Sequence, residues 1–209
     1  ALYCVTTENL KHYLPSTCNL IIVNNVLISI GKITKIFYPD SVTDDFDKTT
    51  DIIIDTIKKA NTEKNIPFAV FKITGISKFS LLEKASQKDK QLNSSETEEL
   101  SKIEARILKI CKTAHELNVP VFIDAEESWV QDIIDTWAFE MMCLFNTEKT
   151  IVYNTIQMYR HDRLNFLKTC LKQALNHNVN YGVKLVRGAY MEKERERALE
   201  MNYPSPIQI

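Results

Sequence analysis

Short apolar runs alternate with longer amphipathic stretches from about residue 47 onward. The apolar runs have the length of strands and cover 68–73, 119–123, 150–156 and 183–186. Between them, apolar residues recur every three or four positions, which is typical of amphipathic helices. Strands separated by such helices predict βαβ units and a parallel sheet, because parallel strands need crossover connections. A doubly wound sheet and a (β/α)8 barrel both fit this pattern.

The same pattern predicts helices over 47–65, 80–85, 95–118, 128–145, 162–174 and 192–200. Ser95 and Glu98 have the spacing of a capping box, and Asn118 followed by Pro120 is a helix stop. Asp162 can cap the helix after 150–156. Three apolar stripes are predicted to face the core: Leu100, Ile103, Ile107, Ile110, Ala114 and Leu117; Val130, Ile133, Ile134, Trp137, Met141 and Leu144; Leu164, Leu167, Leu171 and Ala174.

Composition excludes several classes of protein. The chain has 209 residues, of which 44% are hydrophobic and 25% charged, with a net charge of -1. Such values describe a globular domain and give no electrostatic reason to expect nucleic acid. The five cysteines lie far apart without CxxC or zinc-type spacing, which indicates reduced thiols and no metal site. Residues 1–46 do not join the strand–helix rhythm and form a poorly assigned N-terminal segment. The apolar stretch 20–30 is too short to span a bilayer comfortably.

Polar residues stand at or near the end of each predicted strand. They are Lys72, Asp124, Gln157 and the segment 184–190 (KLVRGAY). The plainer explanation is that chains leave the core at strand ends, where polar residues are common. Four such ends in succession favour a functional site, because the active site of a (β/α)8 barrel lies at the carboxyl ends of its strands.

Lys72 and Lys184 lie inside apolar runs, where an unpaired ammonium is costly. Three explanations stay open: they bind an anionic ligand, form ion pairs with Asp124 or Glu126, or act as amine nucleophiles. Arg187 offers a fork of donors to a phosphate or a ring. Gly188 lets the backbone approach a bound group, or merely ends a strand. No Walker loop occurs, and no GxGxxG follows a strand.

Two features have plain structural explanations. Trp129 and Trp137 fall at helical spacing and are expected to pack in or against the core. The run 192–197 (EKERER) has charge pairs at i,i+3 and i,i+4 and is expected to be a solvated helix face.

Four segments resemble one known family. KLVRGAYMEKERERA followed by NYPSPIQ is similar to the fifth-strand signature of the proline dehydrogenases. FIDAEESW resembles the aspartate-bearing strand of that family, NTIQMYRHDRL its glutamine-bearing strand and FAVFKITG its lysine-bearing first strand. The four segments occur in the family's order, within 47–209. The sequences of these segments are most similar to those of the single-function enzymes of Bacteroidetes-type bacteria and mitochondria, rather than to the large bifunctional bacterial proteins.

The resemblance implies a distorted (β/α)8 barrel that binds FAD and oxidises L-proline to 1-pyrroline-5-carboxylate, with a membrane quinone as electron acceptor. Carried over by motif, Asp124 and Lys184 would be catalytic, and Lys72 and Tyr190 would contact the substrate. The residues implied at the flavin are Ala125, Gln157, Lys184, Val186, Arg187, Gly188 and Ala189. Many bacterial members have RLVKGAY, so this chain exchanges their Arg and Lys at positions 184 and 187.

The family signature extends past NYPSPIQ, so we expect about the first five strands of the barrel within 47–209. We expect the chain alone to have little or no activity. The expected location is a bacterial cytoplasm with peripheral contact to the inner membrane, and the alternative is a mitochondrial matrix. Two other functions stay open: a Schiff-base aldolase that uses Lys72 or Lys184, and a non-catalytic truncated barrel that binds a partner chain.

Overall fold

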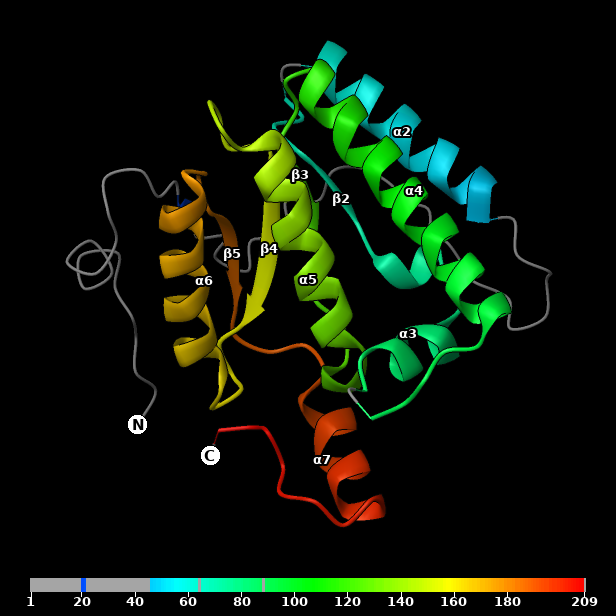
Figure 1. Cartoon of the computed structure of the whole chain (residues 1–209). Coiled ribbons are helices and arrows are strands. Elements are labelled where there is room, and N and C mark those ends of the chain that lie inside the picture. The colour runs from blue at the N-terminus through cyan, green and yellow to red at the C-terminus, as the bar shows by residue number, and fades with distance from the viewer. Residues whose placement is uncertain (1–19, 22–45, 64, 88, 209) are drawn as a thin grey trace.

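A parallel sheet with helices along one face forms the framework of the molecule (Figure 1). The computed structural model describes residues 20–21, 46–63, 65–87 and 89–208. The strands are β1 (Leu20–Ile21), β2 (Ala69–Phe71), β3 (Val121–Ile123), β4 (Val152–Gln157) and β5 (Gly182–Val186). The helices are α2 (Phe46–Thr62), α3 (Phe79–Ala85), α4 (Ser94–Glu116), α5 (Ser128–Phe145), α6 (Arg163–His177) and α7 (Met191–Glu200), with a 3-10 turn at Ile73–Gly75.

The order of the strands distinguishes between the two parallel folds that the sequence allows. The sheet runs β1-β5-β4-β3-β2, and every neighbouring pair is parallel. From β2 to β5 each strand lies beside the next one in the chain. Right-handed crossovers then place all the connecting helices on the same face. A doubly wound sheet instead reverses its strand order and carries helices on both faces.

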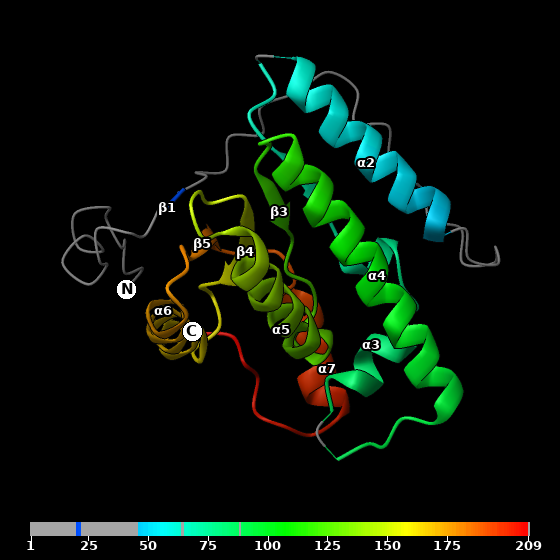
Figure 2. The same cartoon turned by 45° about the horizontal axis from the view of Figure 1, so that its top comes forward.

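The helix layer follows this rule. Helix α2 packs on α4, α4 on α5, and α5 on α6, so these helices lie side by side along the sheet (Figures 1 and 2). The core lies between this layer and the sheet, and its fully buried side chains include Ile57, Ile103, Ile107, Ile110, Ile123, Ile134 and Trp137. The continuous arrangement is that of a barrel wall rather than of a doubly wound sheet.

The predicted helix stripes are largely confirmed. Four of the six stripe residues of α4 are buried, and Trp137 packs in the core, with Trp129 against it. The prediction that Leu144 and Leu164 face the core is wrong, because their exposed fractions are 58% and 45%. Each lies one residue from the end of its helix.

The ends of three helices are set by asparagine. Asn118, Asn178 and Asn202 have φ of 52°, 53° and 55°, the left-handed conformation that asparagine tolerates better than most residues. The predicted stop at Asn118 is therefore confirmed. The predicted capping box is wrong by two residues: Asn93 accepts from the Glu96 backbone N–H at 2.9 Å, and Glu96 accepts from the Asn93 N–H at 2.8 Å. The N-cap of α4 is thus Asn93, two residues before the predicted Ser95.

Gly182 marks a close approach between two strands. A Cβ at this position would lie 2.3 Å from the Val152 carbonyl oxygen and 2.8 Å from Thr150 Cγ2. Any other residue would push the start of β5 away from β4. The requirement for glycine here is therefore steric.

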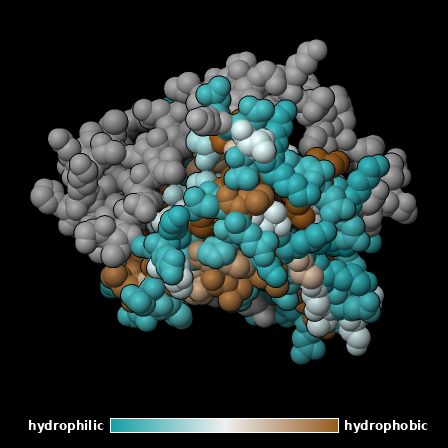
Figure 3. All heavy atoms as spheres, turned by 90° about the horizontal axis from the view of Figure 1, so that it is seen from above, coloured by the Kyte–Doolittle hydropathy of each residue, from teal (hydrophilic) through white to brown (hydrophobic). Residues whose placement is uncertain are grey.

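Two further findings concern the surface and the N-terminal segment. Strand β1 comes from the segment 1–46 that the sequence pattern left unassigned, and it pairs with β5. Seen from the end at which the strands begin, the described surface is mostly hydrophilic with small apolar areas (Figure 3). In the described part of the chain, no helix is long and apolar enough to cross a membrane.

Candidate active site

Four of the predicted site residues meet where the strands end; we call Lys72, Asp124, Lys184 and Tyr190 the rim cluster. Lys184 Nζ is ion-paired with Asp124 Oδ1 across 60 residues of sequence. Lys72 Nζ donates to the Tyr190 hydroxyl at 2.7 Å across 118 residues. The two pairs lie at the same end of the sheet, because the carboxyl ends of parallel strands converge.

Strand register explains how Lys184 reaches Asp124. Thr155 on β4 pairs with Lys184 on β5, and Asn154 pairs with Ile123, the residue before Asp124. Because side chains alternate along a strand, the register brings Asp124, Thr155 and Lys184 to the same face. The Thr155 hydroxyl lies 3.4 Å from Asp124 Oδ1 as a weak donor. Sequence reasoning missed Thr155: it lies in the glutamine-bearing segment NTIQMYRHDRL, but only Gln157 of that segment was given a role.

An aromatic row continues the same face toward the amino ends of the strands. The rings of Phe68 and Phe122 stack with centroids 4.5 Å apart, and Phe122 meets Tyr153 edge-on at 4.9 Å. Lys184 Nζ lies 6.0 Å from the centroid of the Phe122 ring. The rim cluster therefore stands at the end of an apolar surface, where the charged groups interact more strongly than in bulk water.

Charges around Lys72 act on its pKa in opposite directions. Partial burial disfavours the ammonium, but the hydrogen bond to Tyr190 and the carboxylates of Glu126 and Asp124 outweigh it and raise the pKa of Lys72. Burial also raises the pKa of Glu126, although its carboxylate accepts from the Thr74 N–H at 2.9 Å and the Thr74 hydroxyl at 2.6 Å. Lys72 is thus held as a cation. A Schiff-base nucleophile needs a neutral amine, so this environment argues against Lys72 as the nucleophile of an aldolase.

The residues predicted at the flavin fall into a buried and an exposed group. Gln157 and Ala125 are buried, whereas Arg187, Gly188 and Ala189 are exposed in the connection from β5 to α7, after the half-buried Val186. A Cβ at Gly188 would approach only the Met191 sulfur, at 3.1 Å. An exposed arginine beside backbone without a side chain suits an anionic group such as the pyrophosphate of FAD.

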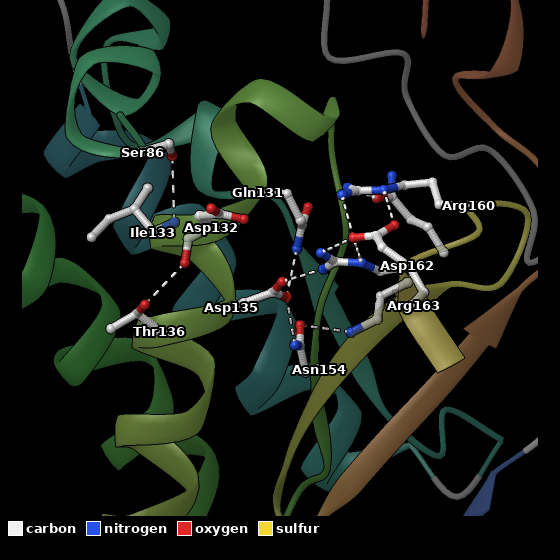
Figure 4. Close-up of polar contacts among 12 residues, drawn as sticks. Ser86, Gln131, Asp132, Ile133, Asp135, Thr136, Asn154, Arg160, Asp162 and Arg163 are labelled. Carbon is white, nitrogen blue, oxygen red and sulfur yellow. Dashed lines mark hydrogen bonds and ion pairs between the residues drawn. The ribbon is translucent and has the colours of Figure 1, made fainter. Parts of the chain in front are cut away.

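A second set of polar side chains lies behind the rim cluster; we call it the polar ring. It consists of the side chains of Gln131, Asp135, Gln157, Arg160, Asp162 and Arg163, joined through the backbone N–H and carbonyl of Glu126. Figure 4 shows its charged part, in which Arg160 and Arg163 both hold Asp162 and Arg163 also reaches Asp135. Gln131 and Asn154 donate to the other oxygen of Asp135, at 2.9 and 2.8 Å. Among the described residues, every buried side-chain nitrogen and oxygen has a hydrogen-bond partner.

The polar ring corrects the prediction for Asp162, and apart from Gln157 its side chains were not predicted as site residues. Asp162 precedes α6 but caps nothing with its side chain, because both arginines occupy its carboxylate. The one signal in the sequence was the pair Gln131 and Asp135, which lie four residues apart on the buried side of α5. Polar residues at that spacing on a buried helix face indicate a satisfied network.

The prediction that the charged run 192–197 forms a solvated helix face is wrong for part of the run. Glu194 is fully buried and accepts from the backbone N–H and hydroxyl of Ser128, both at 2.6 Å. Arg197 pairs with Glu83 and lies over the Trp129 ring, with 4.3 Å between guanidinium carbon and centroid. Helix α7 is thus fixed to the start of α5, which anchors the chain that follows the exposed segment 187–189.

Comparison with known proteins gives the family. The family model described as proline dehydrogenase matches residues 40–209. Proline dehydrogenase 1, mitochondrial, of Drosophila melanogaster is 42% identical over 102 residues, which are 49% of this chain and 15% of that protein. Proline dehydrogenase 2, mitochondrial, of Arabidopsis thaliana is 36% identical over 149 residues, which are 70% of this chain and 31% of that protein. The chain therefore spans less than a third of the length of either relative.

Solved structures agree on the fold. The crystal structure of proline utilization A from Bdellovibrio bacteriovorus, inactivated by N-propargylglycine, superposes with a TM-score of 0.60 at 20% identity. The match covers 78% of this chain and 17% of that one. At this identity the likeness concerns the architecture alone.

Proposed function

Since the chain belongs to the proline dehydrogenase family, we propose that it carries part of the site that oxidises L-proline to 1-pyrroline-5-carboxylate. The observation that carries the proposal is the rim cluster, in which two cations and one carboxylate from three strand ends converge. The matched family and the names of the relatives support proline as the substrate class.

Lys72 and Tyr190 would hold the substrate carboxylate. The Lys72 ammonium has three N–H donors and gives one to the Tyr190 hydroxyl, so donors stay available for an anion. The raised pKa of Lys72 keeps it charged at neutral pH. Asp124 would keep Lys184 oriented through their ion pair, which places a cation over the aromatic row.

The cofactor would be FAD, held by Gln157, Lys184, Val186 and the segment 187–189, with Ala125 beside it. When bound, the flavin would accept the hydride from the substrate carbon next to the nitrogen. The residues of this chain would contribute position and charge: Lys184 and Arg187 would stabilise negative charge on the cofactor, and exposed Gly188 would let the backbone come close.

We further propose that β2 to β5 are the first part of a (β/α)8 barrel, with 47–209 as its share of the domain. The unbroken order from β2 to β5 supports this. The described part of 47–209 has four strands, one fewer than the number expected from the sequence. Electrons would pass to a quinone at a membrane surface. The mitochondrial relatives favour a mitochondrial matrix over a bacterial cytoplasm.

The test is to purify the chain with FAD, desalt it, and add L-proline without oxygen. Bleaching of the flavin spectrum by L-proline and not by D-proline supports the proposal, and it would contradict the expectation that the chain alone has little or no activity. We expect Lys72→Met to raise the proline concentration for half-bleaching by about tenfold or more, because a charge-assisted hydrogen bond is lost. Lys59→Met, on the exposed side of α2, is the matched control and should change nothing.

Other outcomes distinguish the rival functions. Borohydride trapping of a carbonyl substrate on Lys72 or Lys184, in a colourless protein, would instead establish the aldolase. A colourless protein that traps nothing and co-purifies with another chain would favour the non-catalytic barrel.

A further inference from the structure

Gln157 has an amide whose two ends are distinguished by their neighbours. Its Nε2 donates to the Glu126 carbonyl oxygen and, at 2.9 Å, to the Tyr159 hydroxyl. Its Oε1 accepts from Arg160 Nη1 at 3.2 Å. A flipped amide would set NH2 against the guanidinium and oxygen against the carbonyl. Because the side chain is 1% exposed, no water could relieve that mismatch.

Arg160 is fixed in turn by charged partners. Its Nε and Nη2 donate to the two oxygens of Asp162, at 3.1 and 2.9 Å, so the guanidinium makes a bidentate pair. Arg163 Nε donates to the same carboxylate at 2.9 Å, and Arg163 Nη1 donates to Asp135 at 2.8 Å. The orientation of Arg160 is thus set by helices α5 and α6.

The chain of contacts returns to Gln157. Asp135 accepts from Gln131 Nε2 at 2.9 Å, and Gln131 Oε1 accepts from the Glu126 N–H at 2.8 Å. The carbonyl of the same Glu126 receives the amide of Gln157. The polar ring is therefore a closed circuit that holds Gln157 from both ends.

We propose that Arg160 is a positioning residue, which fixes the amide of Gln157 in one orientation for the flavin. This inference rests on the proposed function, since Gln157 is assigned to the cofactor there. Arg160 itself is buried, and its side chain donates to Asp162 and Gln157. Its role is to supply the donor that makes one amide orientation much more favourable than the other.

Arg160→Lys is the variant of choice because it keeps a charge opposite Asp162. A single ammonium cannot make the two Asp162 contacts and the Gln157 contact that the planar guanidinium makes. Arg106→Lys is the matched control. Arg106 is also mostly buried and donates to Asp47 at 2.7 Å and to the Ile76 carbonyl at 3.3 Å, away from the polar ring.

The first readout needs no flavin. The chain is labelled with 15N-glutamine, and the side-chain amide of Gln157 is assigned from the signal that Gln157→Asn removes. In the unaltered chain and in Arg106→Lys, we expect this amide to exchange slowly with solvent. In Arg160→Lys we expect its exchange to be about tenfold faster, because one fixing contact is gone. Equal exchange in Arg160→Lys and the unaltered chain would overturn the inference.

The second readout is FAD affinity by fluorescence titration. We expect about tenfold weaker binding in Arg160→Lys and a change within about twofold in Arg106→Lys. Faster amide exchange with unchanged FAD affinity would overturn the positioning role. If the unaltered chain binds no FAD although its Gln157 amide is protected, the proposed function fails. The amide comparison then decides by itself whether Arg160 fixes Gln157.

Discussion

The rim cluster and the polar ring lie at the same end of the sheet but use their charges differently. In the polar ring, Arg163 contacts two carboxylates and has an exposed fraction of 6%. In the rim cluster, Lys184 has Asp124 as its one hydrogen-bonding partner among the described residues, and Lys72 has Tyr190. The first set directs its donors at the protein, and the second keeps donors for a ligand. Which charges serve the fold therefore depends on how completely they are paired.

The sharpest way to break this comparison is to remove one cation from each set. Arg163→Met leaves Asp135 buried without its charge partner, which typically costs about 3–5 kcal/mol in the free energy of unfolding. Urea denaturation followed by circular dichroism measures it. As a control, Lys58→Met removes an exposed pair with Asp55 and should have little effect. Equal stability of Arg163→Met and the unaltered chain would show that the polar ring is not structural.

Lys184→Met makes the same kind of change in the rim cluster. We expect the free energy of unfolding to change by about 1 kcal/mol or less, because Asp124 is partly exposed and can be hydrated. Reduction of bound flavin by L-proline should slow by about a hundredfold, because a positioned cation is lost. Stopped-flow absorbance under anaerobic conditions tests this. Destabilisation as large as that of Arg163→Met would remove the distinction between the two sets.

Glu194→Gln tests the anchor of α7 at a smaller scale. The carboxylate accepts two hydrogen bonds at the N-terminus of α5, where negative charge is favourable. The amide keeps one acceptor, so we expect a loss of about 1 kcal/mol in the free energy of unfolding. Thermal denaturation of the variant and of Glu192→Gln, an exposed neighbour, makes the comparison. Equal midpoints would show that the Ser128 contact contributes nothing.

The smallest expected effect is a pH dependence from Glu126, which belongs to both regions. Its backbone lies in the polar ring, and its side chain contributes to the charge around Lys72. Burial raises its pKa above 4.5, so the folded chain binds more protons than the unfolded chain just above that pH. Stability from this group is full below pH 4.5 and is lost as the pH rises through the folded pKa. Glu126→Gln should remove this component from denaturation curves measured between pH 4 and 7, and an unchanged profile would contradict it.

The sequence predicted the framework because its elements repeat one local pattern. The helix 128–145 was predicted with the bounds that α5 has, and Ile103, Ile107 and Ile110 are buried as their spacing implied. β3 and β4 begin two residues later than predicted, because hydrophobicity extends into the turn before each strand. β4 also ends one residue later, at Gln157, and β5 begins one residue earlier, at Gly182. The strand predicted over 68–73 is shorter, because its end turns into the 3-10 segment at Ile73.

The site was less predictable, because its contacts join distant residues. The motifs placed Lys72, Asp124 and Lys184 at strand ends, but only the register between β4 and β5 brings Thr155 to them. In the sequence, Glu194 does not differ from the other charged residues of 192–197. Its burial and its hydrogen bond with Ser128 could therefore not be predicted. Arg160 and Arg163 lie in the segment NTIQMYRHDRL, but nothing in that segment indicates which carboxylates they contact. Contacts between residues far apart in the sequence produce no periodic pattern, so they cannot be predicted in the way that helices and strands can.

Gly182 has a consequence for the chemistry that its own atoms cannot perform. Because Gly182 has no side chain, the start of β5 can lie directly against β4. Lys184 follows two residues later on the same face. The contact at Gly182 therefore sets how far the Lys184 ammonium lies from Asp124. Gly182 has no functional group, yet its close packing sets the distance between the Lys184 ammonium and the Asp124 carboxylate.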